Sequence, residues 1–594
     1  MKARPKPNVF DPRRRLLFVA VVLGACGFAI VARAAWLQLL SPEFYQQQGD
    51  ARFLRDVPIV ASRGAILDRN GETLAASSPV ASVWANPRET LQHPQRLAEL
   101  ARALDVPQDD LTRRLSERAE REFVYLRRHM NPDAAAAVVA LGIPGVHEQR
   151  EFRRFYPHGE VMAHVLGFTN IDDQGQEGLE LAFDPWLTGR PGEKRVIRDR
   201  KGQVIDDVDL LRAAEPGREL VLSIDRRVQY LAYRELKAAL QKHRASSGSV
   251  VVLDIPTGEV IAMVNQPSYN PNARQPGQKA ARRNRAVTDL VEPGSVLKAF
   301  TVAAAMENGA DPTQQIDTHP GFFPLHNHTI RDVRNFGMVD MTRLLQKSSN
   351  IASTKLALEM SDEHFHDVLT RFGLAQSTQS GFPGEASGTL EAPRGWGDVE
   401  KATISYGYGI SVTPLQIAQA YAVLANGGRM LPPTFVLGGN QAQGAGRQVI
   451  DPQIARSVVG MLETVVAPGG TATTAAVVGY RVAGKSGTTR RSVAGGYEKR
   501  YISMFAGIVP VRRPRFAMVV AIHDPSAGQF FGGAVAAPVF HGVMDGALRL
   551  MDVPPDNVEA WFATAPAAGA SEISSDGLVP LEPVASAPTP GVQP

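Results

Sequence analysis

This sequence is poor in cysteine: Cys26 is the only one among 594 residues, and it lies in an apolar run. A single cysteine excludes an intrachain disulfide, a C-x-x-C redox pair and a zinc site built on cysteines. It does not exclude an extracytoplasmic location. It means only that the domains are held together by their hydrophobic cores.

The chain also lacks a large excess of charge and a basic stripe interleaved with aromatic residues. The formal net charge is +4, and aromatic residues make up 7% of the chain. This composition does not indicate nucleic-acid binding. Hydrophobic residues (44%) and charged residues (21%) occur in ordinary globular proportions. The length suggests about three or four structural units.

One long apolar run lies near the N-terminus, at residues 16–40, interrupted only by Arg33 and Gln38. A membrane-spanning helix needs about 20 apolar residues, so this run is long enough to be an anchor. Residues 1–15 are basic and precede it. The positive-inside rule therefore predicts a cytoplasmic stub at 1–15, an anchor at 16–40 and the rest of the chain outside.

A cleaved signal peptide is the alternative for this run. A small-x-small cleavage pattern occurs at residues 32–34. However, the apolar run continues past it and exceeds the usual apolar core of about 7–15 residues. The uncleaved anchor is therefore preferred.

Residues 41–215 mix short strands and helices and contain no catalytic constellation, so we expect a mixed α/β pedestal domain that is structural or binds partners. Asn70-Gly71, between Ile66-Leu67 and Thr73-Leu74, predicts a hairpin turn. Much of 88–142 is predicted to be helical from its apolar spacing.

A separate domain is predicted at residues 216–552. Two β-rich runs, 249–254 and 259–264, flank a tight turn and predict a hairpin. A helix is expected from Arg227 to about Leu240, and a mainly helical stretch to about residue 430. Three further strands are predicted at 480–485, 501–509 and 515–523. The expected fold class is α+β, with one five-stranded antiparallel sheet flanked by helices.

The last 42 residues, 553–594, are rich in Ala, Pro and Ser and have few large apolar side chains. Such a segment cannot bury enough surface to offset its chain entropy. We predict a disordered tail.

Three short motifs lie in the 216–552 domain, and each is weak alone. Ser295 and Lys298 open an apolar helix at i and i+3, so their side chains can touch. Burial lowers the pKa of a lysine, which makes this a candidate nucleophile–base pair. Residues 348–350 (Ser-Ser-Asn) lie between two helical stretches, and residues 485–488 (Lys-Ser-Gly-Thr) end a predicted strand. Taken singly, each could be a capping serine or a turn.

Together and in this order, the three motifs resemble the S-x-x-K, S-D-N and K-T-G set of penicillin-binding proteins and class A β-lactamases. The basic stub, the single anchor, the stretch 63–71 and the domain order resemble a class B penicillin-binding protein. Residues 405–416 and 532–540 are most similar to the division-specific member of that class. The elongation-specific paralogue is the nearer alternative. Class A enzymes fit less well, because 41–215 is short and unlike a glycosyltransferase.

The resemblance implies a serine-type peptidoglycan D,D-transpeptidase that cross-links septal cell wall through an acyl-enzyme and is inhibited by β-lactams. It implies that the backbone N–H groups of Ser295 and Thr488 form an oxyanion hole. The other implied roles are Ser295 as nucleophile, Lys298 as base, Ser348 as proton shuttle to the leaving D-alanine, Asn350 as holder of the substrate amide, and Lys485, Ser486, Gly487 and Thr488 as the motif that binds the terminal carboxylate.

The implied partners are stem peptides ending in D-Ala-D-Ala, a membrane glycan polymerase of the FtsW type and other division proteins, with no cofactor. The implied location is the inner membrane at the septum, with the catalytic domain in the periplasm. A D,D-carboxypeptidase and a β-lactam sensor remain open, because the sequence does not reveal the acceptor. A soluble β-lactamase would need neither the anchor nor the pedestal. A non-enzymatic scaffold is disfavoured, because every motif position is filled.

Two other patterns point to different functions. Residues 479–486 match the P-loop pattern, but a P-loop needs a helix after its lysine, and the glycines that follow disfavour one. Residues 326–328 and 364–366 are His-x-His pairs without the spacing of a known zinc motif, so we expect ordinary loop or surface histidines and no metal.

Overall fold

The computed structural model describes residues 12–37, 54–198, 204–442, 446–493 and 496–559. The chain divides into two compact units. Unit 1 comprises the chain up to Ser223 together with residues 268–282 and 381–383, and unit 2 comprises the remainder.

Helix α1 (Pro12–Ala35) falls where the anchor is predicted, although it begins four residues before Leu16. The stretch Arg13–Ala35 is long and apolar enough to cross a membrane, and none of its most apolar window is buried. Most of the predicted stub at 1–15 and the last residues of the predicted anchor lie outside the described residues.

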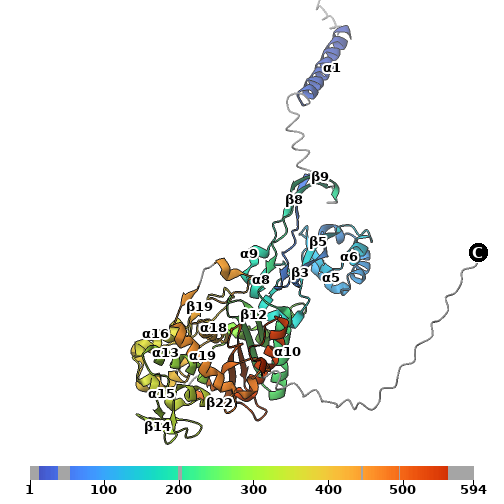
Figure 1. The fold of residues 1–594 in the computed structure, drawn as a ribbon. Helices are drawn as coiled ribbons and strands as arrows, with labels where there is room; N and C mark the ends of the chain where they lie inside the picture. Colours follow the sequence, from blue (N-terminus) through green and yellow to red (C-terminus); the bar gives the residue numbers. More distant parts are fainter. Residues whose placement is uncertain (1–11, 38–53, 199–203, 443–445, 494–495, 560–594) are drawn as a thin grey trace, which may run out of the picture. The chain divides into compact units, whose positions relative to one another are not determined.

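Unit 1 contains two larger β-sheets (Figure 1). A three-stranded antiparallel sheet has the order β1 (Leu54–Ile59), β8 (Gly192–Arg198), β9 (Val204–Arg212). The second sheet contains β10 (Leu220–Val221), β2 (Ile66–Leu67), β3 (Thr73–Ala85), β4 (Val124–Met130) and β5 (Val146–Phe155). The predicted turn at Asn70-Gly71 is confirmed: β2 and β3 pair antiparallel, and Gly71 takes a φ of 84° that favours glycine.

The prediction that much of 88–142 is helical is only partly correct. The helices are α3 (Pro87–Thr90), α4 (Leu97–Ala103), α5 (Gln108–Ser116) and α6 (Pro132–Val139). Strand β4 lies between α5 and α6 and pairs with β3. Pairing with a strand some 40 residues away overrides local helix propensity, and such pairing leaves no local signal.

Residues 268–282 complete the core of unit 1, although they lie beyond its main segment in the sequence. Tyr269 is buried, and its hydroxyl donates to the carbonyl oxygen of Ala163 at 3.1 Å. The Asn272 side chain accepts from the backbone N–H of Tyr156 at 3.0 Å and donates to its carbonyl oxygen at 2.9 Å. Unit 1 is therefore assembled from segments that are far apart in the chain.

Unit 2 is built on a five-stranded antiparallel sheet, which confirms the predicted α+β fold. The strand order is β12 (Val260–Gln266), β11 (Ser247–Asp254), β23 (Phe516–His523), β22 (Gly496–Val509), β21 (Ala483–Val493). Every residue of β11 and β23 is buried. Sheets covered on both faces need such continuous apolar strands rather than alternating ones.

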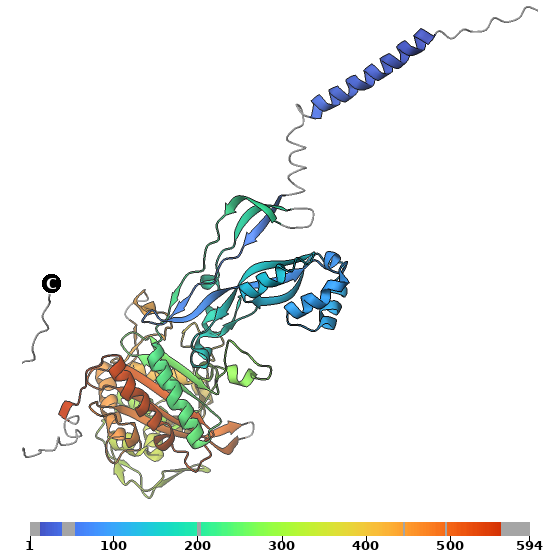
Figure 2. The same cartoon turned by 90° about the vertical axis from the view of Figure 1, so that its right-hand side faces the viewer.

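Helices cover both faces of this sheet. Figure 2 shows α10 (Arg226–His243) and α21 (Ala537–Leu550) side by side over one face. α18 (Pro414–Ala425) packs against β11, β22 and β23 from the other side. The remaining longer helices are α13 (Lys298–Glu307), α14 (Met341–Lys347), α15 (Asn350–Leu358), α16 (Asp362–Arg371), α17 (Asp398–Ser405) and α19 (Pro452–Val466).

Strand β21 differs from the prediction. The sequence predicts a strand that ends at Lys485, whereas β21 begins at Ala483 and continues to Val493, so the motif lies near its start. The strand continues through Gly487 because it pairs with β22, with Lys485 opposite Ala506 and Thr488 opposite Ser503.

The first residues of the predicted tail contact unit 2. The Tyr480 hydroxyl donates to the carbonyl oxygen of Val553 at 2.7 Å. The Asp556 carboxylate accepts from the backbone N–H groups of Arg481 at 2.7 Å and Val511 at 3.1 Å. The rest of the tail, from residue 560, lies outside the described residues.

Candidate active site

Ser295 lies in a 3₁₀ helix, η4 (Gly294–Leu297), that leads directly into α13. Gly294 has a φ of 56°, and a Cβ there would lie 2.4 Å from Cγ2 of Thr489, so this turn requires glycine. Lys298 is the first residue of α13, and its Nζ donates to Ser295 Oγ at 3.1 Å. The side chains therefore meet as the i, i+3 spacing predicts.

The Lys298 amine reaches the second motif as well. Its Nζ donates to the Ser348 carbonyl oxygen at 2.7 Å, to Ser348 Oγ at 3.2 Å and to Asn350 Oδ1 at 2.7 Å. Ser348 caps the C-terminus of α14 with a φ of 63°, and Asn350 begins α15. This left-handed junction turns both residues toward the lysine.

Lys485, on β21, approaches Ser348 from the opposite direction. Its Nζ donates to Ser348 Oγ at 3.0 Å and to the Ser486 carbonyl oxygen at 3.1 Å. The Ser348 hydroxyl therefore contacts two lysine amines. The structure therefore brings together two side chains from the first motif, two from the second and one from the third: Ser295, Lys298, Ser348, Asn350 and Lys485.

Both lysines are completely buried, and burial controls their charge. Desolvation lowers the pKa of Lys298 well below its usual value; the nearby Lys485 lowers it further and Asp332 opposes the shift. Burial alone lowers the pKa of Lys485 to about 7. Neutral amines at physiological pH are thus accessible here, as a general base requires.

The remaining residues of the third motif set the distance between β21 and η4. A Cβ on Gly487 would lie 2.8 Å from Cγ2 of Val296 and 2.9 Å from the Pro293 carbonyl oxygen, so the two segments touch through this glycine. Ser486 Oγ lies 3.0 Å from Oγ1 of Thr471. Thr488 Oγ1 accepts from the backbone N–H of Gly532 at 2.9 Å. The Thr488 hydroxyl is therefore fixed by a glycine outside the three motifs.

Asp332 is a contributor that the motifs did not reveal. It follows β15 (His328–Arg331), and its carboxylate accepts from Ser349 Oγ at 2.6 Å and from the backbone N–H groups of Asn350 at 2.5 Å and Ile351 at 3.2 Å. It thereby caps the N-terminus of α15 and holds the second motif in place. Its distance of 18 residues from Asn350 matches no local capping pattern, so sequence gives no signal for it.

The two competing patterns have ordinary structural roles in the described residues. Residues 479–486 lead into strand β21 rather than into a helix. His326 bonds to the Asp398 carboxylate and His364 to the Ala304 carbonyl oxygen. Within the described part of the chain, no three His, Cys, Asp or Glu side chains gather as a metal site.

Chemically, this cluster suits acyl transfer. A serine hydroxyl touches an amine that burial keeps from being fully protonated, and a second hydroxyl links that amine to another lysine. An activated serine with a proton relay is the arrangement needed to attack a carbonyl carbon.

Comparison with known proteins matches both units. Residues 248–545 match the penicillin binding protein transpeptidase domain, and residues 58–222 match the penicillin-binding protein dimerisation domain. The chain is 44% identical over 550 residues to the peptidoglycan D,D-transpeptidase FtsI of Escherichia coli (strain K12), covering 91% of this chain and 92% of that protein. It is 41% identical over 547 residues to the probable peptidoglycan D,D-transpeptidase PbpC of Pseudomonas aeruginosa, covering 92% and 96%.

Two solved structures are also similar. The crystal structure of a peptidoglycan synthetase from Bifidobacterium adolescentis aligns with a TM-score of 0.67 at 25% identity, covering 84% of this chain and 97% of that one. The apo transpeptidase domain of Burkholderia pseudomallei penicillin-binding protein 3 aligns with a TM-score of 0.52 at 42% identity, covering 56% and 97%.

Proposed function

This chain belongs to the class B penicillin-binding proteins, and from that premise we propose that Ser295 is the nucleophile of its transpeptidase reaction. The chain is a serine-type, FtsI-like peptidoglycan D,D-transpeptidase. The observation that carries the assignment of Ser295 is the contact of its hydroxyl with the fully buried Lys298 amine at 3.1 Å.

In the first half-reaction, Ser295 Oγ attacks the carbonyl carbon of the penultimate D-alanine, and the neutral Lys298 amine takes the hydroxyl proton. The tetrahedral intermediate then expels the terminal D-alanine, whose nitrogen gains a proton through Ser348. The contacts of Ser348 Oγ with Lys298 at 3.2 Å and with Lys485 at 3.0 Å support this relay. In the second half-reaction, the amine of a neighbouring stem attacks the acyl-enzyme and forms the cross-link.

The third motif binds the substrate's terminal carboxylate and the developing oxyanion. A lysine cation and hydroxyl donors from Ser486 and Thr488 suit a carboxylate. The backbone N–H groups of Ser295 and Thr488 are proposed as the oxyanion hole, and loss of one such donor costs about 3 kcal/mol in other enzymes. The close approach of β21 to η4 at Gly487 supports this pairing of the two segments. Asn350 is proposed to hold the substrate amide.

We expect acylation by a carboxylate-bearing β-lactam to show a bell-shaped pH profile. Below the depressed pKa of Lys298 the base is protonated, so the rate falls with falling pH. Above the Lys485 pKa of about 7 the carboxylate loses its cation, so the rate falls again. The profile is measured from stopped-flow acylation rates between about pH 5.5 and about pH 9, a range that brackets physiological pH.

Lys485→Arg is the matched variant for this profile, because arginine stays charged across the range. In this variant the fall in acylation rate at alkaline pH should disappear or shift to higher pH, whatever the absolute rate. An unchanged alkaline limb in this variant would remove Lys485 from the proposed role.

The chain is a single-pass inner-membrane protein. We place its N-terminus in the cytoplasm and its catalytic unit in the periplasm. This topology is supported by Arg13, Arg14 and Arg15, which lie at the N-terminal end of the apolar helix α1.

We further propose a septal role, with unit 1 binding a membrane glycan polymerase of the FtsW type and other division proteins. The similarity to FtsI supports the septal role. Support for a docking function of unit 1 comes from the exposed apolar side chains of β9, Val208, Leu210 and Leu211, which suit a protein partner.

Depletion of the protein in cells distinguishes division from elongation. Filaments are expected, because septal cross-linking stops while side-wall growth continues. Re-expression of the wild type should restore division, and re-expression of Ser295→Ala at the same level should not. Spherical cells would instead assign the chain to elongation.

A further inference from the structure

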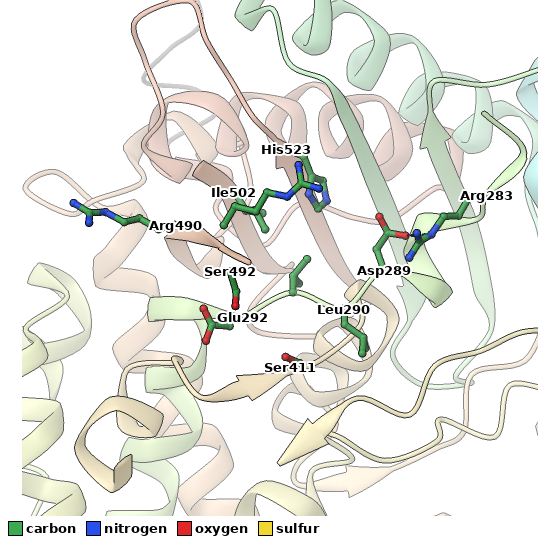
Figure 3. Close-up of a pocket in the computed structure, with 11 residues that line it drawn as sticks. Arg283, Asp289, Leu290, Glu292, Ser411, Arg490, Ser492, Ile502 and His523 are labelled. Carbon is green, nitrogen blue, oxygen red and sulfur yellow. Dashed lines mark ion pairs between the residues drawn. The ribbon is translucent and has the colours of Figure 1, made fainter. Parts of the chain in front are cut away.

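A cavity lies beside the segment that leads to Ser295. Its volume is about 240 Å³. Its lining includes residues 289–292, residues 490–492 of β21, Ile502 in the middle of β22 and His523 at the end of β23 (Figure 3). Its lining residues do not include Ser295, Lys298, Ser348, Asn350 or Lys485. The cavity is therefore distinct from the acylation site, but it shares the backbone that positions the nucleophile.

One side of this cavity is cationic. Asp289 is bonded to Arg283 at 2.5 Å and lies 3.8 Å from Arg285. Asp524 is likewise shared by Arg491 at 3.1 Å and Arg500 at 2.5 Å. The cavity lining carries three arginines, Arg283, Arg490 and Arg491, against two carboxylates, Asp289 and Glu292, which leaves an excess of positive charge.

His523 adds an unsatisfied group to the same side. It ends β23, is 9% exposed, and its ring lines the cavity. Within the described residues its Nε2 has no hydrogen-bond partner. A buried polar atom without a partner costs free energy, so a ligand that supplies one is stabilised there.

The opposite side carries an acidic group. Glu292 Oε1 accepts from the backbone N–H of Gly409 at 2.9 Å and from the Tyr497 hydroxyl at 3.0 Å. Its Oε2 is buried and has no partner among the described residues. Figure 3 shows Glu292 next to Ser492 and Ser411, across the cavity from the Arg283–Asp289 pair. This side can accept hydrogen bonds from a donor such as an ammonium group.

We propose that this cavity is a binding site for an α-amino acid group, with its carboxylate toward Arg491 and His523 and its ammonium toward Glu292. The cavity is smaller than the pockets of roughly 300–1,000 Å³ that hold drug-sized ligands, so it suits a single amino acid. Arginine recognises carboxylates through paired N–H donors, and a buried carboxylate oxygen accepts from an ammonium.

Two sources could supply this chemistry, and both follow from the proposed function. One is the free D-alanine that acylation releases. The other is a diamino acid in a neighbouring stem peptide, where a carboxylate and an amine share one carbon. In either case the ligand contacts Glu292, which lies three residues before Ser295. The ligand therefore binds to the same segment that carries the nucleophile.

The test uses the full chain in detergent, with Ser295 already acylated by benzylpenicillin so that the acylation site is closed. Binding of D-alanine, and separately of a tripeptide ending in a diamino acid, is followed by titration calorimetry. We expect saturable binding of at least one probe. Glu292→Gln and Arg491→Gln should each weaken it about tenfold, because each removes a charged hydrogen bond. Glu391→Gln, an exposed acid of the same unit outside the cavity lining, should leave it unchanged.

The outcomes separate the possibilities. Binding of D-alanine alone identifies the released amino acid as the ligand, and binding of the peptide alone identifies the stem. Equal binding of acetate would overturn the proposal in favour of a simple anion site. No saturable binding, or binding that both cavity variants leave intact, would also overturn it. Failure of benzylpenicillin to label the wild type would instead refute the proposed function.

Discussion

Replacing Ser295 by alanine is expected to abolish covalent labelling by a fluorescent penicillin. The acyl-enzyme needs the Ser295 Oγ atom. The other hydroxyl that contacts Lys298, Ser348 Oγ at 3.2 Å, lies at the junction of α14 and α15, where we assign it the proton relay instead. The variant should remain folded, because alanine fits the same 3₁₀ turn and removes one hydrogen bond. Gel fluorescence after saturating exposure measures the labelling, and the melting temperature should stay within about 2 °C of the wild type.

Ser377→Ala provides the matched control, because Ser377 is an exposed serine in the same unit. It should label like the wild type. Persistent labelling of Ser295→Ala, with the adduct mapped by mass spectrometry to another residue, would reject Ser295 as the nucleophile.

Removing the Lys298 amine is expected to slow acylation by about 10²–10⁴-fold, which is the usual contribution of a positioned general base. The amine is the only side-chain nitrogen recorded in contact with Ser295 Oγ among the described residues. Stopped-flow or quenched-gel acylation rates of Lys298→Ala measure the loss. Labelling should still reach completion over long times, because the nucleophile remains.

Lys298→Met separates the chemistry from the packing. Methionine fills nearly the same buried volume without an amine, so its rate should fall as far as that of the alanine variant. Recovery of a near-normal rate in the methionine variant would mean that Lys298 acts through packing. A near-normal rate in both variants would exclude it as the base.

Much of the fold of unit 2 was predictable, because the local sequence preferences of its elements agree with the structure that they adopt. Strands β11 and β12 were predicted as β-rich runs around a tight turn, and the helix predicted from Arg227 to about Leu240 corresponds to α10. The two strands that prediction misplaced are β4, whose partner β3 lies some 40 residues away, and β21, which pairs with the following strand β22. β21 extends through Gly487 because β22 supplies its hydrogen bonds, and no local preference records that pairing.

The three motifs were recognisable because each is short and local. The contacts that hold the three motifs together were not recognisable from the sequence. Asp332 reaches the second motif from a hairpin, and Gly532 fixes Thr488 from the helix that precedes α21. The cavity beside Glu292 is likewise lined by residues from six separate stretches of the chain, between Arg283 and His523. Sequence spacing cannot reveal these tertiary contacts, because they form only when the chain folds.

The split composition of unit 1 has a consequence for the order in which the chain matures. Synthesis proceeds from the N-terminus, and unit 1 cannot bury Tyr269 or pair the backbone of Tyr156 with Asn272 until the segment 268–282 has been synthesised. By then the β11–β12 hairpin is already present, yet its neighbour β23 lies about 250 residues downstream. The first hairpin of the catalytic sheet therefore has an unpaired edge until β23 has been synthesised. In the topology that we propose, this edge is exposed in the periplasm during that interval.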